Sequence, residues 1–318
     1  METLTLVFRR PHLLFRKPST KRANSPESLI SSELPATPTP TYTKPELLHY
    51  NDLPKWYQDN HYIRTGYRPV SNSYTTCLQS LTYLHNESLN IYTHLLPALV
   101  LAFALPTLQL NISRIYVNAP WLDRFMLTLS PIAALFTLSL SSTYHTLQNH
   151  SALVSSTCLL MDFTGILILI LSSFLSGVYV GFYESPFHQW LYWGMIVTLI
   201  TVSCCLVLHP RLQGPLYRTH RTTAFILTAL SGFAPVFHGV CLYGWHDAYH
   251  YKGVKWWLAE AFWYGLGATF FSTRWPEKGS RKFDFVGSSH QIFHVCVAVG
   301  ASCHCWGVWE AWKNDVEW

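Results

Sequence analysis

Seven apolar segments of membrane-spanning length follow one another along this chain. They cover about residues 90–110, 124–147, 153–176, 188–209, 222–245, 256–273 and 290–312. Each is close to the roughly 17–25 residues that a helix needs to cross a hydrocarbon core of about 30 Å. The segment 256–273 is the shortest of them. The sequence therefore predicts an all-α integral membrane protein that folds as a seven-transmembrane helix bundle.

Charged residues are scarce, which supports this fold class. Asp, Glu, Lys and Arg make up only 12 % of the 318 residues, about half of the roughly 25 % found in soluble domains. Many of these charges lie within about the first 70 residues. The remainder is too apolar to be coated as a water-soluble globule, which argues against an ordinary cytosolic enzyme. The length excludes a small disulfide-stapled secreted domain.

The chain before the first apolar segment divides into two parts. Residues 1–50 are basic at the start and then rich in Pro, Ser and Thr, so they bury too little apolar surface to fold and we expect a disordered tail. Residues 51–89 mix aromatic side chains such as Trp56, Tyr57 and Tyr62 with charges. This mixture is typical of a segment at a membrane interface. Residues 90–318 form the predicted membrane domain.

The positions of Lys and Arg predict the orientation of the bundle. Basic residues begin the N-terminal tail and recur after the fourth and sixth apolar segments, at Arg211, Arg218, Arg221, Arg274, Lys278, Arg281 and Lys282. Short cytoplasmic connections carry such an excess. We therefore expect a cytosolic N-terminus and an outward C-terminus. The net charge of +5 has the same origin, and we expect no nucleic-acid partner.

Ionisable residues within the apolar segments are few and fall at one depth. His145 lies near the end of the second segment, Asp162 in the first half of the third, and His290 and His294 at the start of the seventh. Because successive helices alternate in direction, all four are expected on the cytosolic side. His290 and His294 are four residues apart, so a helix places both on one face, about 6 Å apart along its axis. Such intramembrane residues are costly and usually functional.

Three imidazoles at one depth suit zinc, which binds histidine nitrogen and, in catalytic sites, keeps three protein ligands and one open position. The sequence therefore predicts zinc bound by His145, His290 and His294. Asp162 is either a fourth ligand or holds a water molecule, and Ser141, one turn before His145, can hydrogen-bond into the site. The competing interpretation is that each histidine is a buried polar side chain whose hydrogen bonds are satisfied within the helices and that binds no metal.

Other polar and small residues are expected to support the bundle. Glu87, Asn90 and His94 share a helix face and are expected to pack against the metal site without binding the ion. His238 and His304 are expected to hydrogen-bond to neighbouring helices. Neighbouring side chains on a helix point about 100° apart, so Cys303-His304-Cys305 is not expected to bind a metal. Four glycines predict close helix contacts: Gly165, Gly232, Gly265 and Gly267.

Several strings resemble those of one membrane-protein family. They are YIRTGYRP (62–69), HNESLNIYTH (85–94), SSTYH (141–145), MDFTGI (161–166), RWPEK (274–278) and FDFVGSSHQIFHV (283–295). Over about residues 50–312 the chain resembles the PAQR family, which includes the adiponectin receptors, the haemolysin-III-like proteins and fungal zinc-homeostasis membrane proteins. The usual DYxGI motif reads DFTGI here, which changes an aromatic neighbour and leaves Asp162 intact.

The resemblance implies seven spans, a cytosolic N-terminus and one intramembrane zinc near the cytosolic side. It places the zinc ligands on His145, His290 and His294, the aspartate that contacts the metal's water on Asp162, and the motif serine on Ser141. The family also resembles alkaline ceramidases, which share the Ser, the Asp and the three His. This resemblance implies zinc-dependent hydrolysis of a lipid amide, with Asp162 and Ser141 as catalytic residues. We therefore expect a multi-pass receptor-like protein of lipid and metal homeostasis, in the plasma membrane or endoplasmic reticulum, with ceramidase-like activity.

Two other functions remain as alternatives. The first is a non-catalytic receptor in which zinc ties helices together and a ligand from the extracellular or lumenal side shifts their packing. The second is a channel, for which the sequence offers no ring of charge and no inverted repeat. The expected partners are a ceramide- or sterol-like membrane lipid and an unidentified cytosolic protein.

Overall fold

The computed structural model describes residues 45–212 and 214–317, so most of the predicted disordered tail lies outside the described residues. These residues are helical, apart from connections and one isolated bridge between Leu48 and Tyr67. They form the α-helices α1 (Tyr74–Gln79), α2 (Ser88–Ile115), α3 (Trp121–Leu147), α4 (Ala152–Gly181), α5 (Pro186–Val207), α6 (Arg218–Leu230), α7 (Phe233–His250), α8 (Val254–Thr273) and α9 (Ser289–Glu317). Short 3-10 turns lie at Tyr50–Asp52, Lys55–Tyr57, Ser80–Thr82, Pro210–Leu212 and Pro215–Tyr217.

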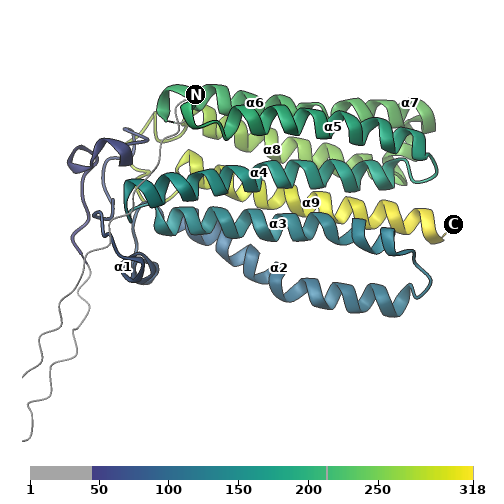
Figure 1. Ribbon diagram of the computed structural model, residues 1–318, viewed down its shortest axis with the longest axis horizontal. Helices are drawn as coiled ribbons and strands as arrows, with labels where there is room; N and C mark the ends of the chain where they lie inside the picture. The colour runs from purple at the N-terminus through teal and green to yellow at the C-terminus, as the bar shows by residue number, and fades with distance from the viewer. Residues whose placement is uncertain (1–44, 213, 318) are drawn as a thin grey trace, which may run out of the picture. The chain divides into compact units, whose positions relative to one another are not determined.

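The long helices lie side by side and alternate in direction (Figure 1). Within the described residues, six helical stretches are long and apolar enough to cross a membrane: α2, α3, α4, α5, α6 together with α7, and α9. The predicted all-α membrane fold is thereby confirmed. The remaining expected segment, 256–273, is the sixth in chain order and corresponds to the 20-residue α8. This helix runs back along α9 but is not among the six.

Helix α8 packs closely against α9 because small residues let the backbones approach. A Cβ added to Gly267 of α8 would lie 2.9 Å from the Cβ of Cys296, and one added to Gly307 of α9 would lie 2.7 Å from the Cβ of Trp256. The predictions for Gly165, Gly232 and Gly267 are confirmed, since each lies against a neighbouring helix. The prediction for Gly265 is wrong, because an added Cβ there meets nothing within 4 Å.

The sequence pattern predicts one apolar segment over 222–245, but the structure has two helices there, α6 and α7. The break falls at Ser231 and Gly232, and Pro235 lies in the first turn of α7. Proline has no N–H to bond the carbonyl four residues earlier, so an interruption is expected just before it. The two helices continue in nearly the same direction (Figure 1).

A folded segment closes one end of the bundle, where α3 ends and α4 and α9 begin (Figure 1). Its core is a small apolar cluster of Leu53, Tyr57, Ile63 and Tyr67. The backbone amide of Arg64 and the hydroxyl of Thr65 donate to Asp284, in the connection between α8 and α9. This segment therefore fixes the connection that leads into α9.

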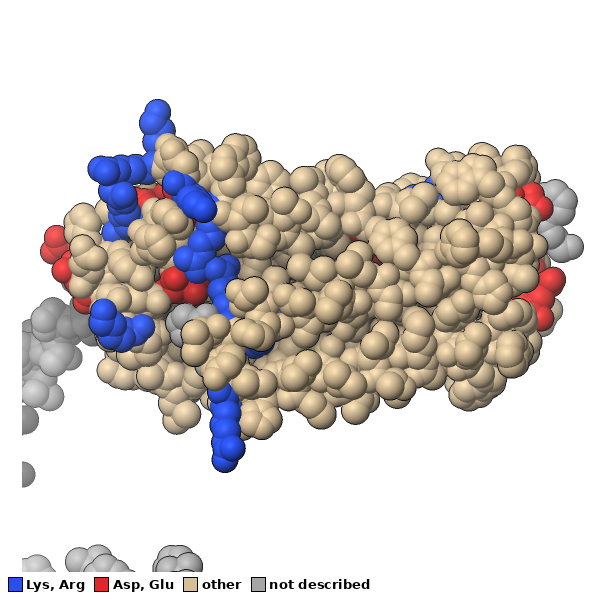
Figure 2. Space-filling view, turned by 90° about the horizontal axis from the view of Figure 1, so that it is seen from above, with Lys and Arg blue, Asp and Glu red and all other residues tan. Residues whose placement is uncertain are grey.

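Basic side chains gather at the same end of the bundle, and a surface without charge covers its middle (Figure 2). At the opposite end, Lys252 pairs with Asp315 and Lys255 with Glu310. Side chains exposed along the middle include Phe103, Phe136 and Phe262, which are 58–79 % exposed. A large exposed apolar surface of this kind fits the lipid of a bilayer.

Candidate metal centre

Three histidines converge at the end of the bundle that carries the folded segment. The Nε2 atom of His290 lies 3.2 Å from that of His145 and 3.1 Å from that of His294. Helix α3 supplies His145 from its last turn, and α9 supplies the other two from its first two turns. Nitrogen ligands around a tetrahedral zinc, each about 2.0–2.1 Å from the ion, lie about 3.3 Å apart. The three side chains have the spacing of a metal site.

Neighbouring groups determine which nitrogen of each ring carries a proton. The Nδ1 atom of His294 lies 2.9 Å from the carbonyl oxygen of Asn90, which can only accept, so Nδ1 donates. The Nδ1 atom of His145 lies 2.7 Å from Glu87 Oε2. Burial by itself would raise the pKa of Glu87, but the hydrogen bonds from His145 and Asn90 lower that pKa to about 2, so the ionised carboxylate also accepts. Such outer contacts orient histidine ligands and raise their basicity.

The Nε2 atoms of His145 and His294 therefore both carry lone pairs, and both face His290. The proton of one neutral imidazole can satisfy only one of the two lone pairs. A cation among the three nitrogen atoms satisfies all three at once. The donor set thus fits a metal ion that prefers imidazole, such as zinc.

Two further residues hold the histidines in place. The imidazole of His94 stacks on that of His294 at 3.7 Å between ring centres and donates from Nε2 to the His294 carbonyl. Arg68 is fully buried and donates to the carbonyl oxygens of His145 and Thr146, at 2.6 and 3.0 Å. Carbonyls at the end of a helix lack partners within the helix, so Arg68 caps α3 at the metal ligand. Glu87, Asn90 and His94 thus contact the histidine cluster, as expected.

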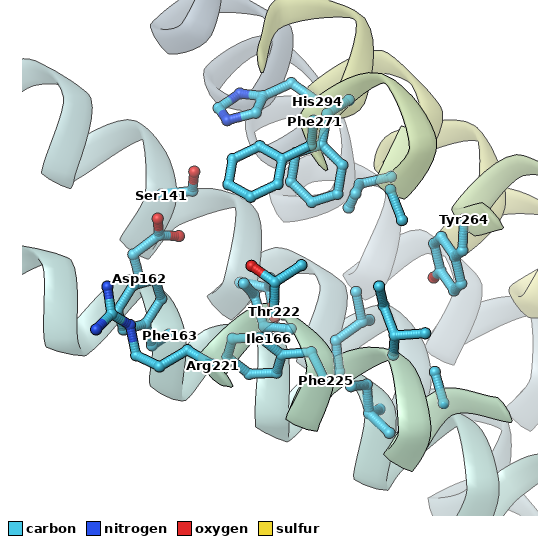
Figure 3. A pocket seen from close by; sticks show the side chains of 18 of the residues that line it. Ser141, Asp162, Phe163, Ile166, Arg221, Thr222, Phe225, Tyr264, Phe271 and His294 are labelled. Atoms are coloured by element: carbon cyan, nitrogen blue, oxygen red, sulfur yellow. The ribbon is translucent and has the colours of Figure 1, made fainter. Parts of the chain in front are cut away.

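Asp162 and Ser141 lie beside each other and close to the histidines, on α4 and α3 respectively (Figure 3). The ligand atoms of the three histidines lie within 4.8 Å of one another, and Asp162 is not in that group.

A cavity of about 740 Å³ opens beside the three histidines and extends between the helices toward the far end of the bundle. His290, His294, Ser141 and Asp162 line it near the histidine cluster. Apolar side chains such as Phe163, Ile166, Phe225 and Phe271 line the adjoining part (Figure 3). A polar end and a long apolar interior together suit an amphiphile.

The remaining histidines named from the sequence have structural partners. His238 Nδ1 lies 2.7 Å from the hydroxyl of Tyr192 on α5. His304 contacts Glu260 on α8 and Ser176 on α4. Both predictions are confirmed, and His304 is turned to these partners instead of to Cys303 and Cys305.

Sequence reasoning alone misses Arg68 and Glu260. Glu260 lies inside the apolar segment 256–273, and an acidic residue in such a segment is itself the signal that could have found it. Arg68 lies outside the apolar segments, where an arginine is ordinary, and only its place in the string YIRTGYRP (62–69) could have drawn attention to it.

Comparison with known proteins agrees with this arrangement. The family described as haemolysin-III related matches residues 82–305. The chain is 33 % identical to the ADIPOR-like receptor IZH2 of Saccharomyces cerevisiae over 269 residues, which cover 84 % of each chain. The chain belongs to the PAQR family.

Other PAQR relatives span fungi and animals. The ADIPOR-like receptor IZH1 of Eremothecium gossypii is 34 % identical over 261 residues, 81 % of this chain and 82 % of the relative. The adiponectin receptor protein of Drosophila melanogaster is 33 % identical over 266 residues, which cover 83 % of this chain and 59 % of that protein. The matched region contains every residue of the histidine cluster, so the candidate centre belongs to the shared PAQR domain.

Proposed function

We propose that the chain is a zinc-containing PAQR membrane protein that hydrolyses the amide of a ceramide-like lipid. The observation that carries this proposal is the convergence of three imidazole nitrogens at the polar end of a long apolar cavity. His145, His290 and His294 would hold the ion. Bound there, zinc would lower the pKa of a water molecule toward neutrality and polarise a lipid carbonyl.

We propose seven membrane crossings, with α8 as the sixth in chain order. A helix of 20 residues is about 30 Å long, which is enough to cross the hydrocarbon core. Its close packing on α9 supports this placement. The basic side chains at the histidine end (Figure 2) support a cytosolic N-terminus, because cytosolic connections are enriched in Lys and Arg.

The side chains near the histidines would have separate roles in the hydrolysis. Asp162 accepts a proton from the attacking water molecule, and the oxygen of that water forms a bond to the carbonyl carbon. Asp162 then returns the proton to the amine as the carbon–nitrogen bond breaks, so a fatty acid and a free amine result. The Ser141 hydroxyl beside Asp162 orients its carboxylate.

The cavity supports a lipid substrate. Its apolar walls would take an acyl chain, and the guanidinium groups of Arg218 and Arg221 also line it. Arg218 lies over the ring of Phe271 at 4.4 Å and Arg221 over that of Phe163 at 5.3 Å. Held on these rings, the two cations would attract the carboxylate of the product.

The test measures zinc content and ceramide turnover on the purified full chain. We expect the wild type to hold zinc and release fatty acid, and His290→Ala to lose both. Asp162→Asn should keep zinc and lose turnover. His188→Ala, which changes a histidine outside the cavity lining, is the matched control and should keep both.

Two outcomes would contradict the proposal in different ways. A folded wild-type protein without zinc would refute the metal assignment. A zinc-loaded wild-type protein that turns over none of several ceramides would refute hydrolysis and leave a receptor with a structural metal.

A further inference from the structure

A second polar cluster lies on the same cavity, deeper in the bundle than the metal centre. The Nδ1 atom of His304 lies 2.8 Å from Glu260 Oε2, and its Nε2 atom lies 3.0 Å from the hydroxyl of Ser176. The side chains of His304 and Glu260 are 2 % and 14 % exposed, and both residues line the cavity. A carboxylate at this depth is costly, and such residues usually have a function.

The hydrogen bonds leave one oxygen of Glu260 as an acceptor. The Ser176 hydroxyl also lies 2.8 Å from the Ser172 carbonyl and 2.6 Å from the Ser130 hydroxyl. The contact with His304 Nδ1 occupies Oε2 of Glu260. Within the described part of the chain, no group donates to the remaining Oε1 atom of Glu260.

Tyr264 adds an unused hydroxyl one helical turn further along α8. Its ring packs on Gly300 of α9, and Figure 3 shows it among the side chains of the cavity wall. Its hydroxyl oxygen is buried and makes no hydrogen bond to any described residue. Residues four apart share a helix face, so Glu260 and Tyr264 offer an acceptor and a donor to the same stretch of cavity.

The two groups lie at a defined distance from the metal centre. Gly300, against which Tyr264 packs, is six residues beyond His294 on α9, or about 9 Å along the helix. His304, which holds Glu260, is ten residues beyond His294, or about 15 Å. A lipid with its polar head at the histidines would therefore bring the middle of its chain to Glu260 and Tyr264.

We propose that Glu260 and Tyr264 recognise a hydroxyl group carried in the middle of a lipid chain. A hydroxyl that donates to Glu260 Oε1 and accepts from Tyr264 pairs with both groups, whereas a plain methylene pairs with neither. The preferred ligand is then a chain-hydroxylated amphiphile. This specificity rests on the proposed function, in that the cavity holds the chain of a lipid whose head lies at the metal.

The test is a binding assay on the detergent-purified full chain. Stearic acid and its mid-chain hydroxy derivative each displace a fluorescent fatty acid from the wild type, and we expect the hydroxy acid to bind about tenfold more tightly. Tyr264→Phe removes only the hydroxyl and should reduce this preference to less than about threefold. Glu260→Met removes the acceptor and should do the same. Tyr74→Phe changes an exposed phenol away from the cavity and should leave the preference unchanged.

Zinc content and unfolding temperature show whether each variant is folded. Equal binding of both acids by the wild type, or an unchanged preference in either folded variant, overturns the proposal. If Glu260→Met does not fold, Tyr264→Phe decides alone. The assay needs no hydrolysis, so a preference found in a protein without ceramide turnover refutes only the proposed function.

Discussion

The contact between Glu87 and His145 connects a helix that supplies no metal ligand to one that does. Glu87 precedes α2, and its carboxylate sets the proton position on His145. Asn90 donates to the same Glu87 oxygen, at 2.6 Å. The first helix of the bundle therefore acts on the metal centre through a hydrogen bond to a ligand.

Glu87→Gln tests this contact. The amide is neutral and a weaker acceptor, so we expect zinc affinity to fall about 10–100-fold with the fold retained. Competition with a chelator of known affinity measures the change. Glu310→Gln, which alters a carboxylate paired with Lys255 at the opposite end, should leave zinc affinity at the wild-type value. An equal loss in both variants would assign the effect to general destabilisation.

At the end of the bundle opposite to the histidines, Asp123 also connects helices through hydrogen bonds, and its role is structural. Its carboxylate is 1 % exposed and accepts from Tyr183 at 2.9 Å and Trp312 Nε1 at 2.8 Å, and also from Tyr179. Tyr179 lies on α4, Tyr183 in the turn that follows α4 and Trp312 on α9, so Asp123 of α3 connects three helices.

Asp123→Asn should lower the free energy of unfolding by about 1–3 kcal/mol, because the amide NH₂ faces donors in either orientation. Thermal unfolding in detergent measures this loss. Zinc content should not change, since the histidines lie at the opposite end. An unfolding temperature equal to that of the wild type would show that these hydrogen bonds contribute no net stability.

At the residue scale the sequence predicts best where chemistry and spacing coincide. The convergence of His290 and His294 could be predicted because residues four apart lie on one face of a helix. His145 could be added because it falls at the same expected depth in the membrane. The position of Asp162 outside the histidine group depends on how α4 is rotated against α3, which no local pattern records. Glu260 and Arg68 act through tertiary partners, and their roles emerge only from the packed bundle.

At the scale of elements, the apolar segments predict the long helices and their order. The hydropathy of α8 is reduced by residues such as Lys255 and Glu260. Their partners, Glu310 and His304, both lie on α9, so a window along the sequence does not detect them. The division into α6 and α7 is marked by Pro235, although the break falls four and three residues before it.

Two glycines on α8 provide a matched test of helix packing. Gly267→Ala places a methyl group 2.9 Å from Cys296 and should destabilise the bundle by about 1–3 kcal/mol. Gly265→Ala enters open space and should be neutral or stabilising by up to about 1 kcal/mol, since alanine is the better helix former. Unfolding temperatures of both variants in the same detergent decide the matter. Equal effects would mean that α8 does not pack on α9 through Gly267.

At the scale of the whole molecule, orientation can be tested with glycosylation tags. Expressed in eukaryotic cells, a tag after the C-terminus should be glycosylated and a tag before residue 1 should not, because we propose that the basic end of the bundle faces the cytosol. The native sequons at Asn86 and Asn149 are buried at the histidine end, at 5 % and 2 % exposure, and should stay unmodified. Sugar on the N-terminal tag would reverse the proposed orientation.

The separation of the three histidines along the chain has a consequence for biogenesis. His145 and His290 are 145 residues apart, and synthesis proceeds from the N-terminus, so α3 is in the membrane long before α9 is made. The metal position is incomplete until α9 has taken its place beside α3. Capture of the proposed zinc ion would therefore be a late event in assembly, and a chain arrested before α9 would lack two of the three histidines.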